Sequence, residues 1–118
     1  MKYVLLVYGE EKDLFALTPE RSAKLDADSL AYDRELDRQG KLIMAQALQP
    51  VKMSKSLRRR KGKRLVTDGP FAETKEQLLG FVMIEAADLD EAMAIADGIP
   101  LAELGTVEVR AVYDIPGS

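Results

Sequence analysis

The segment that decides the fold runs from Thr67 to Gly80 and reads Thr67-Asp68-Gly69-Pro70-Phe71-Ala72-Glu73-Thr74-Lys75-Glu76-Gln77-Leu78-Leu79-Gly80. It separates a strongly basic stretch from the apolar run Phe81-Val82-Met83-Ile84. Glycine tolerates positive φ and proline cannot continue a central strand, so Asp68-Gly69-Pro70 predicts a reversal of the chain. The spacing of Thr74 and Gln77 is that of a capping box, which predicts a helical turn beginning at Thr74.

The basic stretch upstream predicts a β-hairpin with arms at Met53–Leu57 and Arg64–Thr67 and a turn at Lys61-Gly62. Eight cationic residues and no acidic one lie in it, and without them the chain has nine basic and 20 acidic residues, a net charge of −11. Such a hairpin suits an acidic partner or a phosphate, or it merely discourages edge-to-edge aggregation. No aromatic residue is interleaved for base stacking, so we do not expect nucleic-acid binding. The residues that would contact an anionic partner are Arg58, Arg59, Arg60 and Lys61.

The rest of the chain alternates strands and helices. Strands are expected at Tyr3–Tyr8, Leu42–Leu48, Phe81–Ile84 and Thr106–Tyr113, and helices from Thr18 to about Gln39 and from Asp88 to Gly98. The order β-α-β, hairpin, β-α-β predicts one α+β domain over residues 1–118, a ferredoxin-like βαββαβ sandwich with an inserted hairpin. Two helices cover only one face of such a sheet. Because the central strands are apolar on both faces, we expect a homodimer that buries the other face.

The composition excludes several kinds of chemistry. The chain has no cysteine and no histidine, which removes thiolate nucleophiles, imidazole bases and the usual ligands of transition metals. We expect no metal site and no cofactor, with a carboxylate-bound Mg²⁺ or Ca²⁺ as the alternative that stays open. Hydride chemistry is not favoured, because no redox cofactor motif is present. The apolar runs have the length of strands, and no secretory h-region follows Met1. A cytoplasmic protein without membrane contact is therefore expected.

The sequence from Asp68-Gly69-Pro70-Phe71 through Gln77 resembles the hallmark of the DGPF family, a branch of the YCII-related proteins. The resemblance covers nearly the whole chain, and it implies a dimeric α+β barrel with a cleft inside or beside each half. Enzyme-like YCII members carry a proposed catalytic His-Asp pair, which this histidine-free chain cannot provide. Leu79 also stands where the DGPF group usually has a glycine. Family members often occur beside extracytoplasmic-function sigma factors, which makes a sigma-factor-system protein a second kind of partner.

The candidate site centres on Asp68. Its carboxylate could act as a general base or bind a ligand, or it could fix its own turn by accepting backbone hydrogen bonds. Tyr8 is the other acid/base candidate, with a core or interface role as the alternative. Arg110 could clamp a carboxylate or phosphate. The remaining candidate ligand-binding residues are Gly69, Pro70, Phe71, Glu73 and Lys75, of which the two charged ones could equally face solvent or form a salt bridge.

Two functions follow from these observations. In the first, the homodimer binds an unknown small metabolite in a cleft near Asp68, with or without a lyase-type or proton-transfer step on it. In the second, the chain is an accessory or regulatory protein of an extracytoplasmic-function sigma factor system, and the basic hairpin contacts the partner. The sequence alone leaves open whether the protein is an enzyme.

Overall fold

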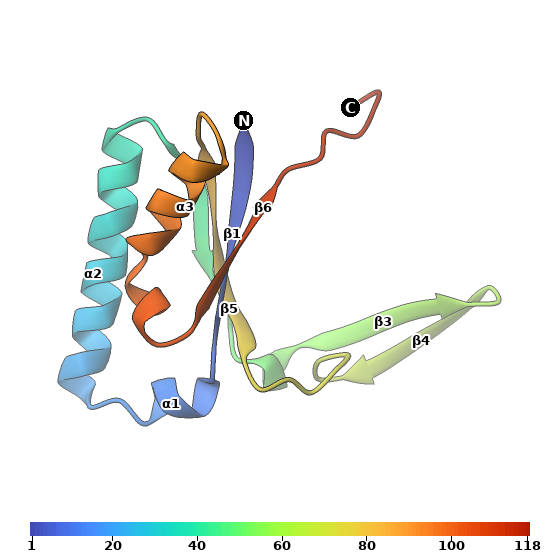
Figure 1. Cartoon of the computed structure of the whole chain (residues 1–118). Coiled ribbons are helices and arrows are strands. Elements are labelled where there is room, and N and C mark those ends of the chain that lie inside the picture. The colour runs from blue at the N-terminus through green and yellow to red at the C-terminus, as the bar shows by residue number, and fades with distance from the viewer.

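A computed structural model describes all residues, 1–118, and contains six strands and three helices (Figure 1). Two short 3₁₀ turns, Val51–Met53 and Pro100–Glu103, complete it. In chain order the elements are β1 (Lys2–Gly9), α1 (Glu11–Phe15), α2 (Pro19–Arg38), β2 (Leu42–Ala47), β3 (Lys55–Arg60), β4 (Lys63–Asp68), β5 (Gln77–Glu85), α3 (Leu89–Asp97) and β6 (Thr106–Ala111).

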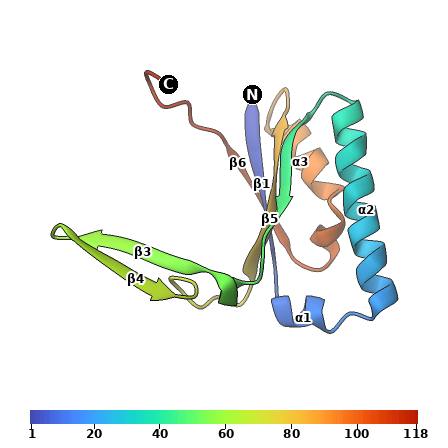
Figure 2. The ribbon, with the colours of Figure 1, turned by 180° about the vertical axis from the view of Figure 1, so that it is seen from behind.

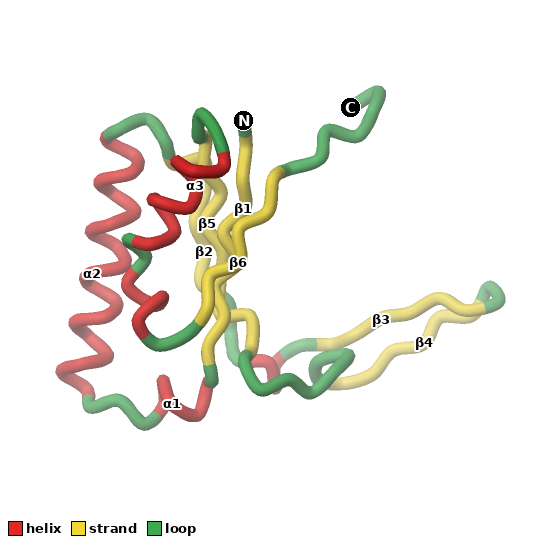
Figure 3. The backbone as a smooth tube through the Cα atoms, in the orientation of Figure 1, coloured by secondary structure: helices red, strands yellow, loops and turns green.

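Four strands form an antiparallel sheet in the order β2-β5-β1-β6, and β3 and β4 form a separate two-stranded hairpin (Figure 3). This order, with helices between β1 and β2 and between β5 and β6, is the ferredoxin-like α+β arrangement. The expected fold class is therefore confirmed. None of the helices combines the length and the apolar composition that crossing a membrane would require.

The core lies between the sheet and the two longer helices, α2 and α3, which cover the same face (Figure 1). On β1 the buried residues Tyr3, Leu5 and Val7 alternate with half-buried ones, as expected for a strand with one face in the core. Leu5 is paired with Val82 on one side and Val109 on the other. The buried residues of the core are Tyr3, Leu5, Val7, Leu36, Val82, Ile84, Ala86, Ala92, Ile95, Ala96 and Ile99.

Both longer helices begin at the residues that the sequence indicates. The hydroxyl of Thr18 accepts a hydrogen bond from the Arg21 N–H (3.2 Å), and Pro19 occupies the first helical position. The Asp88 carboxylate accepts a hydrogen bond from the Glu91 N–H (2.9 Å) at the start of α3. These caps satisfy N–H groups that have no partner within the helix.

Two elements differ from the expectation. The acidic segment after β1, which lies outside the expected strands and helices, forms the short helix α1. The prediction of a helical turn beginning at Thr74 is wrong, because the chain enters strand β5 at Gln77. The Gln77 side chain instead turns back and donates to the carbonyl oxygen of Thr74 (2.7 Å).

The second face of the sheet is uncovered. Val4, Leu6 and Tyr8 alternate with the core-facing residues of β1 and so point away from the helices, and Leu6 and Val4 pair with Phe81 and Met83. We call this surface the open face. Only 13 of the 118 residues are buried, because the open face and the hairpin both lie in solvent.

The Tyr32 hydroxyl joins α2 to α3 by donating to the carbonyl oxygen of Ile95 (2.7 Å). Burial, and then the negative charge of Asp97, raise the pKa of Tyr32 above its ordinary value. A raised pKa in the folded state means that the stabilisation is fully present below about pH 10, the pKa in the unfolded chain, and is lost as pH rises through the folded-state pKa.

We expect Tyr32→Phe to lower the free energy of unfolding by about 1 kcal/mol at pH 7, since one hydrogen bond is lost. The variant should also lose less stability than the wild type above pH 10. Urea unfolding at pH 7 and pH 11 measures both effects. Tyr113→Phe is the matched control, because Tyr113 is 77% exposed. An equal change in the free energy of unfolding for both substitutions would contradict a stabilising hydrogen bond from Tyr32.

Candidate functional site

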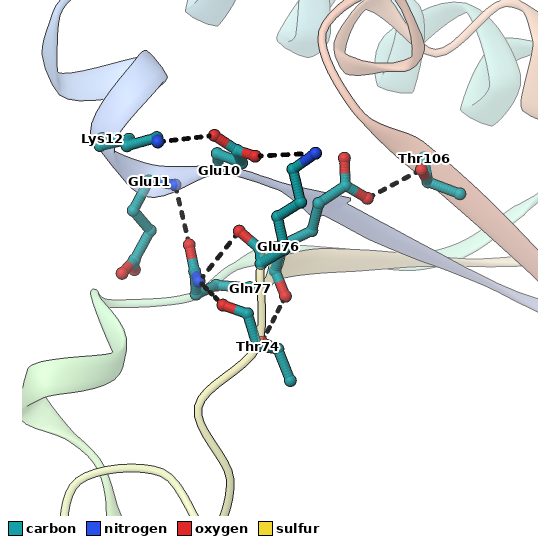
Figure 4. A network of polar contacts seen from close by, with 8 residues as sticks. Glu10, Glu11, Lys12, Thr74, Glu76, Gln77 and Thr106 are labelled. Atoms are coloured by element: carbon teal, nitrogen blue, oxygen red, sulfur yellow. Dashed lines mark hydrogen bonds and ion pairs between the residues drawn. The ribbon is translucent and has the colours of Figure 1, made fainter.

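Residues 69–76 connect β4 to β5 at the end of the sheet where β1 ends, and we call them the motif loop (Figure 1). Gln77 holds this loop to the sheet. Its Oε1 accepts a hydrogen bond from the Glu11 N–H (2.9 Å), while its Nε2 donates to the carbonyl oxygens of Thr74 (2.7 Å) and Lys75 (3.4 Å) (Figure 4). One side chain therefore ties the start of α1 to the end of the loop.

Glu76 fastens the same loop to β6. Its Oε1 accepts a hydrogen bond from the Thr106 hydroxyl (2.8 Å; Figure 4). Thr106 is paired with Tyr8 in the sheet, so the half-buried Tyr8 lies on the open face directly beside this contact. The structure thus brings the candidate Tyr8 close to the motif loop.

Glu10 and Glu11 are two site residues that the sequence reasoning missed. The Glu10 carboxylate lies between Lys75 (3.8 Å) and Lys12 (3.4 Å), and its side chain is only 15% exposed (Figure 4). The Glu11 carboxylate accepts a hydrogen bond from the Val51 N–H (3.0 Å). The available signal was an acidic pair directly after Gly9, at the end of a buried strand. Lys75, a candidate ligand-binding residue, is an ion-pair partner in this network.

Asp68 lies at the base of the β3–β4 hairpin. Its side chain is 89% exposed, and its nearest charged partner is Lys55, whose Nζ lies 3.6 Å from Oδ1. The turn is held by other groups, since the Gly69 N–H donates to the Ser54 carbonyl oxygen (2.8 Å) and the Ser56 hydroxyl donates to that of Gly69 (2.9 Å). The backbone hydrogen bonds that would have made Asp68 a purely structural turn residue are not formed.

A groove of about 370 Å³ runs beside the motif loop. It contains two candidate residues, Pro70 and Glu73, and an opposite charge from Lys52 on the neighbouring 3₁₀ turn. Asp68 is not in its lining, and Phe71 points into solvent with 77% of its surface exposed. The residues that line the groove are Val51, Lys52, Pro70, Ala72, Glu73, Thr74 and Gln77.

Arg110 lies apart from the motif loop. It is paired with Val4, and Glu108 with Leu6, so both charged side chains belong to the open face. Arg110 lies four positions after Thr106 along β6, a distance of about 13 Å in an extended strand. A small ligand in the groove therefore does not reach Arg110 of the same chain.

Leu79 has a structural role that the sequence did not suggest. It lies within β5, where the register with β1 shifts between Val7 and Tyr8, and its carbonyl oxygen accepts a hydrogen bond from Leu48 (2.8 Å). A Cβ atom added to Gly9 would lie 2.9 Å from its side chain. The following Gly80 is required, since a Cβ atom there would lie 2.6 Å from the carbonyl oxygen of Gln46.

We expect Gln77→Ala to destabilise the chain by about 1–3 kcal/mol, because three hydrogen bonds of the loop lose their partner. Amide hydrogen exchange should accelerate in residues 69–76 and at Glu11, while exchange in α2 changes little. Glu73→Ala is the matched control, since Glu73 forms no ion pair or hydrogen bond in the structure. Unchanged exchange in the Gln77→Ala loop would show that Gln77 does not hold it.

Three comparisons with known proteins agree with this geometry. The family model of the YCII-related domain matches residues 1–116. An uncharacterized protein of Rhizobium meliloti is 40% identical over 112 residues, covering 93% of this chain and 90% of that protein. The crystal structure of a 5-chloro-2-hydroxyhydroquinone dehydrochlorinase from Burkholderia phenoliruptrix, in complex with 2,5-dihydroxybenzoquinone, superposes with a TM-score of 0.56 at 16% identity, covering 96% of this chain and 94% of the enzyme. That likeness shows the shared fold of the dimeric α+β barrel proteins. The chain belongs to the YCII-related family.

Proposed function

We propose that the protein is a cytoplasmic homodimer that binds a small polar metabolite at the motif loop, near Asp68. This proposal rests on one observation. The side chains of Thr74, Glu76 and Gln77 are all used to fix the loop, whereas Asp68, Phe71 and Glu73 face solvent beside the groove. A fixed loop with outward-facing side chains suits binding, because a loop that is already ordered loses little entropy when a ligand binds.

The groove indicates the chemistry of the ligand. Its volume of about 370 Å³ is at the lower end of the range of small-molecule sites. Lys52 offers an ammonium group and Glu73 a carboxylate, so a matching ligand carries an anionic group and a hydrogen-bond donor or ammonium group. A small hydroxy acid or amino acid has this pattern.

The open face supports the homodimer. Val4, Leu6, Phe81 and Met83 form a continuous apolar surface across β1 and β5, and soluble monomers rarely leave such a surface in water. Packing two open faces together would enclose Tyr8 and Arg110 between the sheets. In that arrangement Arg110 is the proposed group for a carboxylate or phosphate of a ligand that reaches between the two sheets.

A lyase-type or proton-transfer step on the ligand is the catalytic form of this proposal. Asp68 is the proposed base, with Tyr8 as the second acid/base group. The Asp68 carboxylate is 89% exposed in the single chain, so its action as a base requires a partner subunit or a ligand that excludes water from it. The dehydrochlorinase with the same fold supports a lyase-type reaction as the first to assay, although 16% identity relates the two proteins by fold alone.

A second candidate function is that of an accessory or regulatory protein in an extracytoplasmic-function sigma factor system. The basic β3–β4 hairpin supports it, since Arg58, Arg59, Arg60 and Lys61 are all exposed and extend away from the sheet (Figure 2). Replacing the three arginines by glutamate should abolish capture of such a partner and leave ligand binding intact. Capture that is unaffected by this triple substitution would remove the hairpin from the contact.

The ligand proposal is tested by thermal unfolding of the wild type and Asp68→Asn in the presence of small hydroxy acids, amino acids and phenols. A ligand that binds only the folded state raises the melting temperature, by mass action, and we expect Asp68→Asn to lose most of that increase. Asp26→Asn is the matched control, because Asp26 is an exposed, unpaired carboxylate on α2. Equal increases in melting temperature for Asp68→Asn and Asp26→Asn would exclude Asp68 from the binding site. If no compound raised the melting temperature of the wild type, the proposed metabolite site would be contradicted.

A further inference from the structure

The β3–β4 hairpin extends from the body of the chain as an arm (Figures 1 and 2). Its two strands pack extensively only against each other. The radius of gyration of the chain is 16.3 Å, whereas a compact domain of this length has about 13.5 Å. A two-stranded hairpin is at best marginally stable in water by itself, so the arm needs a surface to pack against.

The pairing of the two strands further destabilises an isolated arm. Arg59 is paired directly with Arg64, and Arg60 with Lys63, which places like charges opposite each other at two successive positions. The turn adds Lys61, which holds a positive φ of 52°. No acidic residue lies between Lys52 and Arg64 to offset these charges. The matching surface is therefore acidic.

The arm is also apolar near its base. Leu57 is paired with Val66 on one face, and Leu65 lies on the other, and these side chains are 56%, 49% and 49% exposed. The complementary surface must combine apolar side chains with carboxylates.

The end of the sheet opposite the arm has this combination. Residues 112–118, which we call the C-terminal segment, leave the sheet there and extend to the same side as the arm (Figures 1 and 2). Tyr113 and Ile115 are 77% and 66% exposed, and Asp114 lies between them. Further exposed carboxylates at this end are those of Glu85, Asp88 and Asp90.

Symmetry decides how two copies bring these surfaces together. If two open faces pack about a two-fold axis parallel to the strands, the arms meet each other, and the seven cationic residues of one arm face the seven of the other. If the axis runs across the strands, each arm meets the C-terminal segment of the other copy. The chain measures 47 × 46 × 19 Å, so the arm, the sheet and the C-terminal segment lie within one thin layer and a single rotation aligns both contacts.

We infer that in the homodimer the β3–β4 arm of each protomer packs against the C-terminal segment of the other, with the face that carries Leu57 and Val66 on Tyr113 and Ile115 and the cationic half of the arm beside Asp88, Asp90 and Asp114. This inference rests on the proposed homodimer and adds the place of the arm within it. The arm is then part of the interface between two copies of this chain.

The absence of cysteine allows a direct test. Leu57→Cys and Ile115→Cys introduced together give the chain its only two thiols, at opposite ends of the sheet, where they cannot join within one protomer. We expect mild oxidation or a short bismaleimide to convert most of the double variant into covalent dimer on a non-reducing gel. Each single-cysteine variant should give little covalent dimer under the same conditions. A second pair on the same face of the arm, Val66→Cys with Tyr113→Cys, repeats the test if the first double variant folds poorly.

Light scattering on the same samples separates this inference from the proposed homodimer. Dimeric samples in which neither double variant cross-links would overturn the position of the arm and leave the homodimer standing. Covalent dimer from the single variant Leu57→Cys would also overturn the inferred position of the arm, because it would show that the two arms of the dimer contact each other. Monomeric samples would contradict the homodimer and, with it, this inference.

Discussion

One face of the four-stranded sheet has no helix over it, and the rest of the structure depends on how that face is covered. The helices of a ferredoxin-like chain lie on a single side, while β1 and β5 are apolar on both. Burial of apolar surface is the main favourable term in folding, and here the chain leaves much of it unused. In the proposed homodimer, a second copy that presents the same face would bury this apolar surface.

The stretch from Asp68 to Gln77, which contains the motif loop, shows how one segment of sequence serves two purposes. Its second half fixes position, since Gln77 and Glu76 bind the start of α1 and the side of β6. Its first half leaves Asp68, Phe71 and Glu73 in solvent. A motif of this kind therefore does not mark a set of equivalent catalytic residues. Some of its members hold the loop so that others can meet a ligand or a subunit.

Local signals were read correctly from the sequence, and distant contacts were not. The caps at Thr18 and Asp88 depend on neighbouring residues only, so they could be predicted. The spacing of Thr74 and Gln77 fits a capping box equally well, but Gln77 makes its decisive hydrogen bond to Glu11, 66 residues away. The role of Glu10 could not be predicted either, because its ion-pair partner Lys75 is distant in sequence. The direction of the arm, which places Asp68 outside the groove, is also a tertiary property.

The central claim is that the open face is buried against a second copy. The molar mass in solution, measured by multi-angle light scattering at micromolar concentration, tests it most directly. We expect twice the 13.1 kDa mass of the chain, and a return to the single mass when Leu6, in the middle of the open face, is replaced by aspartate. A wild-type mass of 13.1 kDa across the micromolar range would contradict the claim, because the open face would then be stable in water.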